Sequence, residues 1–137
     1  MAELKFSTGD VSFTVNDGAE ISYNPTDMAF VERLFDAFDA LDKKQEEYKR
    51  KVDGAAGTRE IFAVGRELDA EMRTLIDGVF GSGVCDGVFG GMNTYAMADG
   101  LPVWCNFVFA VMDTVDTTFA REQKATNPRL EKYMKKY

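Results

Sequence analysis

The sequence contains no histidine. Ser-His and Cys-His nucleophilic catalysis, histidine acid–base chemistry and most transition-metal sites need an imidazole, so its absence excludes them together. Cysteine is scarce too: Cys85 and Cys105 are too few for a disulfide framework or a cysteine zinc site. Their apolar neighbours favour buried, reduced thiols. We therefore expect no catalytic site, no bound metal and no cofactor, and a protein that is not an enzyme.

Positive charge is scarce as well. The 16 lysines and arginines face 23 aspartates and glutamates, which gives a net charge of −7 and an isoelectric point of about 4.6. Nucleic-acid binding depends on clustered lysine and arginine, so we expect no nucleic-acid partner. The chain has no signal-peptide pattern at its start and no apolar run of about 18 residues. We expect a soluble, cytoplasmic protein with no membrane contact.

The few bases are distributed unevenly along the chain. None occurs from Thr74 to Ala120, whereas residues 121–137 hold 6 of the 16 bases and only 2 of the 23 acids. A basic tail on an acidic body favours contact with an acidic surface, such as a second copy of the chain. The alternative is a solvated tail that only improves the electrostatics of a helix end. The charge pattern leaves both open.

Residues 1–24 have the pattern of short antiparallel strands. The runs "LKFS" and "VSFTVN" flank a turn at Thr8-Gly9-Asp10, and "AEISYN" follows Asn16-Asp17-Gly18. Asparagine, aspartate and glycine tolerate the positive φ angles of tight hairpin turns. Apolar and polar residues alternate in the middle run, which predicts a sheet with one buried face.

Apolar residues recur at helical spacing over three later stretches. The first follows Pro25, where Thr26 or Asp27 can act as the N-cap, and the third follows Pro102. These patterns predict one α+β domain over residues 1–137. Its expected parts are a small antiparallel sheet of two or three strands (1–24), three main helices (26–52, 58–78 and 102–121) and a basic tail with a short helix (122–137).

Glycine is concentrated in "GVFGSGVCDGVFGG", residues 78–91. A dinucleotide-binding loop needs G-x-G-x-x-G after a strand, but Gly87 follows Gly81 and Gly83 one residue too late, and a predicted helix precedes the loop. A phosphate-binding Walker loop needs a lysine, which this region lacks. Without a nearby base, Cys85 has no means of activation. We therefore predict a turn that ends the second helix.

Carboxylates are the remaining acid–base candidates. Asp113 and Asp116 lie three residues apart on the third predicted helix and could share a site. An exposed pair on a helix surface is the commoner arrangement. A calcium loop is not predicted, because the sequence contains no D-x-[DN]-x-[DN]-G run.

The third predicted helix is apolar around most of its circumference, so it is either central in the core or partly covered by a partner. We expect association of the protein with itself, as a homo-oligomer, or with a helical partner through this helix and the Phe-Gly turn. A core position is the alternative for each aromatic residue concerned. The candidate partner-binding residues are Phe80, Phe89, Trp104, Phe107, Phe109 and Phe119.

Two short motifs carry a family resemblance. An Ile-Asp-x-Val-Phe-Gly-x-Gly turn is followed by a Phe-Gly-Gly segment. The predicted order of strands and helices on both sides of these motifs also contributes, so that the resemblance covers residues 10–120. Together these features resemble the small tail assembly chaperones of long-tailed phages and prophages of Gram-positive bacteria. The matching residues are Ile76, Asp77, Val79, Phe80, Gly81 and Gly83, then Phe89, Gly90 and Gly91.

The resemblance implies a non-enzymatic role in the cytoplasm of the infected host cell. Proteins of this family bind the apolar, helical tape measure protein, recruit tail tube protein subunits and leave before the virion is complete. The alternative function is a structural virion component, such as a head-tail connector or a tail-completion protein, which would stay in the particle.

Overall fold

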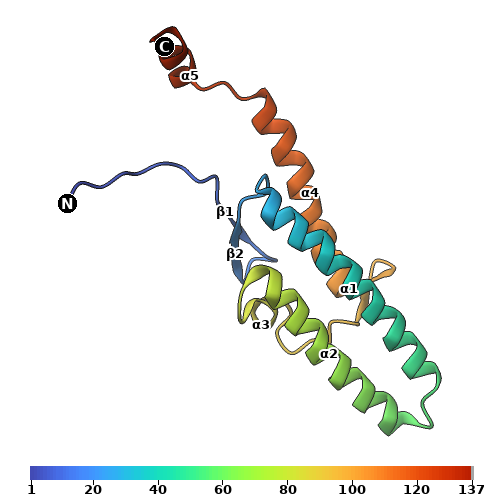
Figure 1. The fold of residues 1–137 in the computed structure, drawn as a ribbon. Coiled ribbons are helices and arrows are strands. Elements are labelled where there is room, and N and C mark those ends of the chain that lie inside the picture. The colour runs from blue at the N-terminus through green and yellow to red at the C-terminus, as the bar shows by residue number, and fades with distance from the viewer. Residues whose placement is uncertain (137) are drawn as a thin grey trace.

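A computed structural model describes residues 1–136 and has the predicted α+β class (Figure 1). Tyr137, the last residue of the predicted basic tail, lies outside the described residues. The elements in chain order are β1 (Val11–Thr14), β2 (Glu20–Tyr23), α1 (Met28–Asp53), α2 (Thr58–Phe80), α3 (Val84–Phe89), β3 (Met97–Ala98), β4 (Leu101–Pro102), α4 (Val103–Lys124) and α5 (Pro128–Lys136).

Strands β1 and β2 form a hairpin with the predicted turn. Phe13 lies opposite Ile21 in the antiparallel register. Asn16 and Asp17 have left-handed backbone, with φ of 49° and 59°, which these two residue types tolerate. Strand alternation turns Ile21 and Tyr23 to the same side, where both are buried. One face of the hairpin therefore packs into the core.

The prediction of a further strand at "LKFS" is wrong, because residues 1–10 form no regular structure. Leu4 and Phe6 are 94% and 81% exposed, so the segment buries no apolar face that could hold it against the body. A hairpin turn was expected at Thr8-Gly9-Asp10. Instead, the Asn24 side chain donates a hydrogen bond to the Thr8 carbonyl there (Nδ2···O 2.7 Å). The sheet at this end has two strands, and the N-terminal residues extend away from the body (Figure 1).

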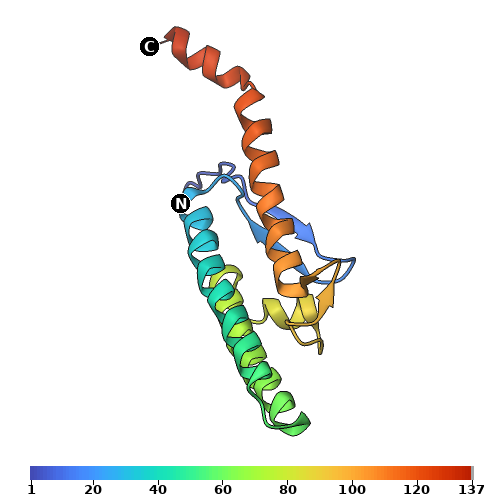
Figure 2. The ribbon, with the colours of Figure 1, turned by 90° about the vertical axis from the view of Figure 1, so that its right-hand side faces the viewer.

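Helices α1 and α2 run antiparallel and lie side by side (Figures 1 and 2). Asp27, one of the two predicted N-caps, begins α1, and its Oδ1 accepts a hydrogen bond from Ala29 N at 3.0 Å. The facing apolar stripes of the two helices form much of the core. Their fully buried residues include Leu34, Leu41, Leu68, Met72 and Ile76.

Helix α4 packs on both the helix pair and the hairpin. Trp104 Nε1 donates to Gln45 Oε1 of α1 at 2.8 Å, and the hydroxyls of Thr114 and Tyr23 are 2.8 Å apart. From residue 120 to residue 134 every side chain is exposed. The end of α4 and helix α5 therefore project from the body (Figures 1 and 2).

The three predicted helices are confirmed as α1, α2 and α4, and their bounds differ from the prediction by three residues or fewer. Helix α3 and the small β3–β4 hairpin were not predicted: α3 lies within the stretch predicted only as a turn, and the hairpin lies between that turn and the third predicted helix. Among the described residues, no helix combines the length and the apolar character needed to cross a membrane.

Candidate functional site: an apolar groove

The Asp77 side chain shapes the Phe-Gly turn. Gly81 N donates to the Asp77 carbonyl at 2.7 Å, which ends α2. The Asp77 carboxylate then accepts hydrogen bonds from Gly83 N at 3.2 Å and Cys85 N at 2.9 Å, and so caps the first turn of α3. Gly81 and Gly83 have φ of 121° and 80°, which glycine adopts at little cost. The predicted turn is confirmed, and the acid of the Ile-Asp motif positions the helix that follows it.

Arg73 of α2 binds residues 86–92, the segment from α3 to the following turn, and holds it against the body. Its Nη1 lies 2.8 Å from the Asp86 carboxylate, and its Nη2 donates to the Gly90 and Met92 carbonyls at 2.9 and 2.7 Å. Its Nε donates to Asp69 at 3.0 Å. A guanidinium suits this role because its planar fork holds five donors in fixed directions. One side chain thus sets the path of the chain from α3 to residue 92.

Asp69 holds the residues that come next. Its Oδ1 accepts hydrogen bonds from both Thr94 N (2.7 Å) and Thr94 Oγ1 (2.8 Å), and Thr94 is completely buried. The neighbouring Asn93 donates through Nδ2 to the Gly65 carbonyl at 3.0 Å. The segment is therefore anchored to α2 on both sides of residue 92 before the chain enters β3.

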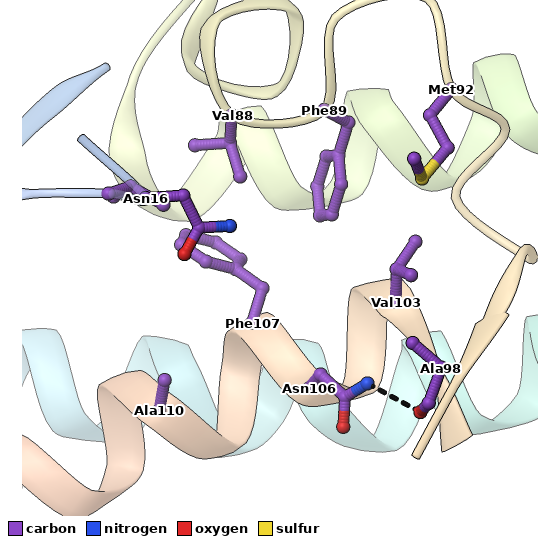
Figure 3. Close-up of a pocket in the computed structure, with 10 residues that line it drawn as sticks. Asn16, Val88, Phe89, Met92, Ala98, Val103, Asn106, Phe107 and Ala110 are labelled. Atoms are coloured by element: carbon purple, nitrogen blue, oxygen red, sulfur yellow. Dashed lines mark hydrogen bonds between the residues drawn. The ribbon is translucent and has the colours of Figure 1, made fainter. Parts of the chain in front are cut away.

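A groove of about 330 Å³ opens between this anchored segment, the start of α4 and the tip of the β1–β2 hairpin. Figure 3 shows Val88 and Phe89 on one side of the space and Val103 and Phe107 of α4 on the other. Such an apolar lining with a few amide groups is typical of a binding site. The full lining is Val15, Asn16, Val88, Phe89, Met92, Ala98, Val103, Asn106, Phe107 and Ala110.

The surroundings of the groove are acidic. The segments that line it, residues 11–23 and 84–120, contain no lysine or arginine. Four exposed aspartates lie within three residues of lining positions in the chain. Asp86 is paired with Arg73, whereas Asp17, Asp99 and Asp113 form no ion pair with another described residue. Uncompensated negative charge around an apolar groove favours a partner that carries basic residues beside apolar ones.

A second hollow of about 260 Å³ lies between β1 and the following turns of α4. Val11 and Phe13 form its apolar side, and Asp113 and Thr117 belong to its α4 side. Arg121 also lines this hollow, so the base-free part of α4 ends here. The first groove is the larger of the two, and its lining contains no charged residue.

Three of the predicted partner-binding aromatics meet at the groove. Phe89 and Phe107 line it, and their rings meet edge to face with centroids 5.7 Å apart. Phe80 packs on Phe107 with a centroid distance of 5.2 Å. The Phe-Gly turn and the aromatic helix therefore contribute to one site, although Phe107 itself is largely buried.

The other three aromatics lie elsewhere. Trp104 is buried and hydrogen-bonded to Gln45, so it is a core residue and is not available to a partner. Phe109 is exposed and stacks on Phe38 of α1, and Phe119 lies beside the N-terminal segment. Each residue advances about 100° around a helix, so Phe109 and Phe119 do not share the face of Phe107.

Several groove residues were not predicted from the sequence. Val103 and Ala110 have i, i+4, i+7 spacing with the predicted Phe107, which could have identified the α4 side of the groove. Asn16 and Met92 reach the groove from two turns that are far apart in the sequence. No spacing rule brings these two turns together.

The remaining chemical candidates are unsuited to nucleophilic catalysis. Cys85 and Cys105 are both buried and free, as predicted. Burial, reinforced by the Asp77 carboxylate, raises the pKa of the Cys85 thiol to about 12, and a protonated thiol is a poor nucleophile. Asp113 and Asp116 are exposed on α4. Among the described residues, no three acidic or cysteine side chains gather in a way that could hold a metal ion.

Comparison with known proteins gives one match. The model of a family of unknown function, DUF6673, matches residues 17–137, and the chain belongs to that family. The matched region includes α4, α5 and all of the groove lining except Val15 and Asn16. No curated protein and no solved structure matches the chain.

Proposed function

We propose that this member of the DUF6673 family is a non-enzymatic tail assembly chaperone of a phage or prophage. It binds the tape measure protein and tail tube subunits in the cytoplasm of the host cell. One observation carries the proposal: the motifs that resemble the chaperones position one wall of an apolar groove and supply one of its lining residues. Asp77 of the first motif caps α3, and Phe89 of the second lines the groove. A role in recognition requires such motif residues at a binding surface.

The groove fits the chemistry of the proposed partner. The tape measure protein is long, helical and apolar, and an amphipathic helix places its apolar side chains into a groove at i, i+3 and i+4 spacing. Val88, Val103 and Phe107 offer apolar contacts, while the aspartates around them favour basic residues on the flanks of the bound helix. Binding of this kind would keep apolar segments of the partner out of water until assembly.

The groove contains no side chain that transfers protons at neutral pH. Its polar lining groups are the amides of Asn16 and Asn106, which do not ionise. Asn106 Nδ2 donates to the Ala98 carbonyl at 2.9 Å, so this amide already holds β3 against α4 (Figure 3). The lining therefore supports contact rather than catalysis.

Co-expression with the tape measure protein tests the proposal. Ala110 is an exposed residue of the groove, and Ala110→Arg would place a long, charged side chain in it without disturbing the core. Ala63→Arg is the matched control, because Ala63 is an exposed alanine on α2 away from the groove. We expect the wild type and the control to keep the tape measure protein soluble, and Ala110→Arg to lose this effect. Tape measure protein that stays equally soluble without the chaperone would refute the proposal.

Mass spectrometry of purified virions separates the proposal from its alternative. A chaperone leaves before the particle is complete, so the protein should be absent. A constant number of copies per particle would instead indicate a head-tail connector or a tail-completion protein.

A further inference from the structure

We propose that the groove also receives helix α5 of a second copy of this chain, so that copies bind one another through their C-terminal ends. The inference goes beyond the proposed function, because it concerns contact between identical chains and holds whatever other partner the groove takes. Three observations support it: α5 has an exposed apolar face, the charges of α5 and of the groove are of opposite sign, and α5 is far from the groove of its own chain.

Helix α5 has an exposed apolar face. Leu130, Tyr133 and Met134 have i, i+3, i+4 spacing and so lie on one side of the helix. They are 65%, 47% and 72% exposed. A helix of 9 residues is marginal in water by itself, and most of its stability must come from packing of its apolar face. The groove offers such a surface, lined by Val88, Phe89, Val103 and Phe107.

The charges of α5 and of the groove are complementary. Arg129 and Lys132 of α5 belong to the segment 121–137, which holds 6 bases and 2 acids. The groove lies in segments without any base, and three aspartates that are close in the chain to its lining residues are exposed: Asp17, Asp99 and Asp113. A helix with an apolar face and basic flanks therefore matches an apolar groove with an acidic rim.

The helix cannot extend along the groove of its own chain as far as the far wall. Val103, on the far wall, lies about 32 Å along the α4 axis from Lys124, at 1.5 Å per residue. The link from Lys124 to Pro128, fully extended, and the helix up to Met134 together reach back by about 23 Å at most. Figures 1 and 2 place α5 at the opposite end of α4 from α3 and the β3–β4 hairpin. Folding back would bring α5 only to the near end of the groove at Ala110, about 21 Å from Lys124, so a helix that occupies the whole groove must come from another copy. Exchange in both directions closes a dimer.

Cross-linking between two different variants tests this contact directly. One sample carries Met92→Cys in the groove, and a second, tagged sample carries Met134→Cys on α5. The native cysteines are both buried, which limits their background reaction. When the samples are mixed under mild oxidation, we expect the disulfide between the two variants to form about ten-fold faster than with a surface control, since docking raises the effective concentration.

The control variant is Met28→Cys at the start of α1. Met28 is 63% exposed and Met92 is 53% exposed, so the two introduced thiols are similarly accessible, but Met28 does not line the groove. Equal cross-linking of the two positions with Met134→Cys would overturn the proposal.

Sedimentation of the full-length protein gives a second measurement. We expect self-association that weakens as salt is added, with a dissociation constant raised about ten-fold by Ala110→Arg and changed less than about two-fold by Ala63→Arg. A wild-type protein that stays monomeric at high concentration would also overturn the inference. The two proposals can be told apart. If cross-linking is absent but the tape measure protein is kept soluble, only the α5 contact is refuted. If cross-linking occurs but the tape measure protein is not kept soluble, only the proposed function is refuted.

Discussion

Apolar residues are buried in the body of this protein and exposed at its two ends. Within residues 11–119 the apolar side chains of the hairpin and four helices meet in one core, where Leu68 and Met72 are completely buried. Every residue of segments 1–10 and 120–134 is exposed, although they contain Leu4, Phe6 and Leu130. The difference is the presence of a second layer, because an apolar face is buried only where another element covers it.

This contrast separates the residues that stabilise the fold from those that are free to bind. Loss of a body residue should lower the free energy of unfolding, whereas loss of an end residue should leave it unchanged and alter contacts with other molecules. Four predictions test this division, from the largest expected effect on stability to the smallest.

Trp104→Ala should have the largest effect, because it removes a buried aromatic ring and its hydrogen bond to Gln45. We expect the free energy of unfolding, measured in urea, to fall by about 3–5 kcal/mol. Leu130→Ala in α5 is the matched change at an end and should stay within about 0.5 kcal/mol. Similar losses for both variants would break the division between body and ends.

Asp69→Ala tests the polar anchor of the groove wall. The change leaves the buried Thr94 N–H and hydroxyl without their acceptor and removes one partner of Arg73. We expect a loss of about 2–3 kcal/mol in urea unfolding, with increased amide exchange near Thr94. Asp113→Ala is the control, since Asp113 is exposed and makes no ion pair with a described residue, and an equal loss there would contradict the role of Asp69.

The free energy of unfolding should fall at alkaline pH. Burial and Asp77 raise the pKa of the Cys85 thiol from 9.0 to about 12, and burial raises the pKa of the Tyr23 hydroxyl as well. The unfolded chain therefore loses these protons at lower pH than the folded chain does. The stabilisation is complete below pH 9 and is lost as the pH rises from about 9 towards 12. The slope of Tm against pH in this range should be smaller for Cys85→Ala, and an unchanged slope would refute the assignment.

The smallest effect is expected for the N-terminal segment. Leu4→Ala combined with Phe6→Ala should leave the free energy of unfolding within about 0.5 kcal/mol of the wild type, because neither side chain packs on the body. Thermal unfolding followed by circular dichroism is sufficient to measure this. A clearly lower Tm would mean that this segment packs on the body in solution.

The parts of the fold that were predictable depend on neighbours in the sequence. The turn at Asn16 and Asp17, the Asp27 cap and the three long helices all follow from local spacing and backbone preference. The β3–β4 hairpin had such a signal that was not used: Asp99-Gly100 is a favoured two-residue turn, and both residues have positive φ, 54° and 81°.

The site was less predictable, because it depends on contacts between distant residues. Arg73 lies 19 residues before Met92, and nothing in the local pattern shows that its guanidinium binds that carbonyl. The prediction of a strand at "LKFS" was wrong for the opposite reason. Its local pattern suits a strand, but the fold gives it no neighbouring strand to pair with. The motif residues of the Phe-Gly turn pointed to the right region without giving its shape.

The way α2 holds the groove wall has a mechanical consequence. The four contacts of the Arg73 guanidinium and the two of Asp69 Oδ1 depend on two side chains that also bind each other. Hydrogen bonds that share partners in this way form and break together rather than one at a time. We therefore expect the stretch from Asp86 to Thr94 to detach as one unit, so that loss of either side chain would disturb the whole wall of the groove that it forms.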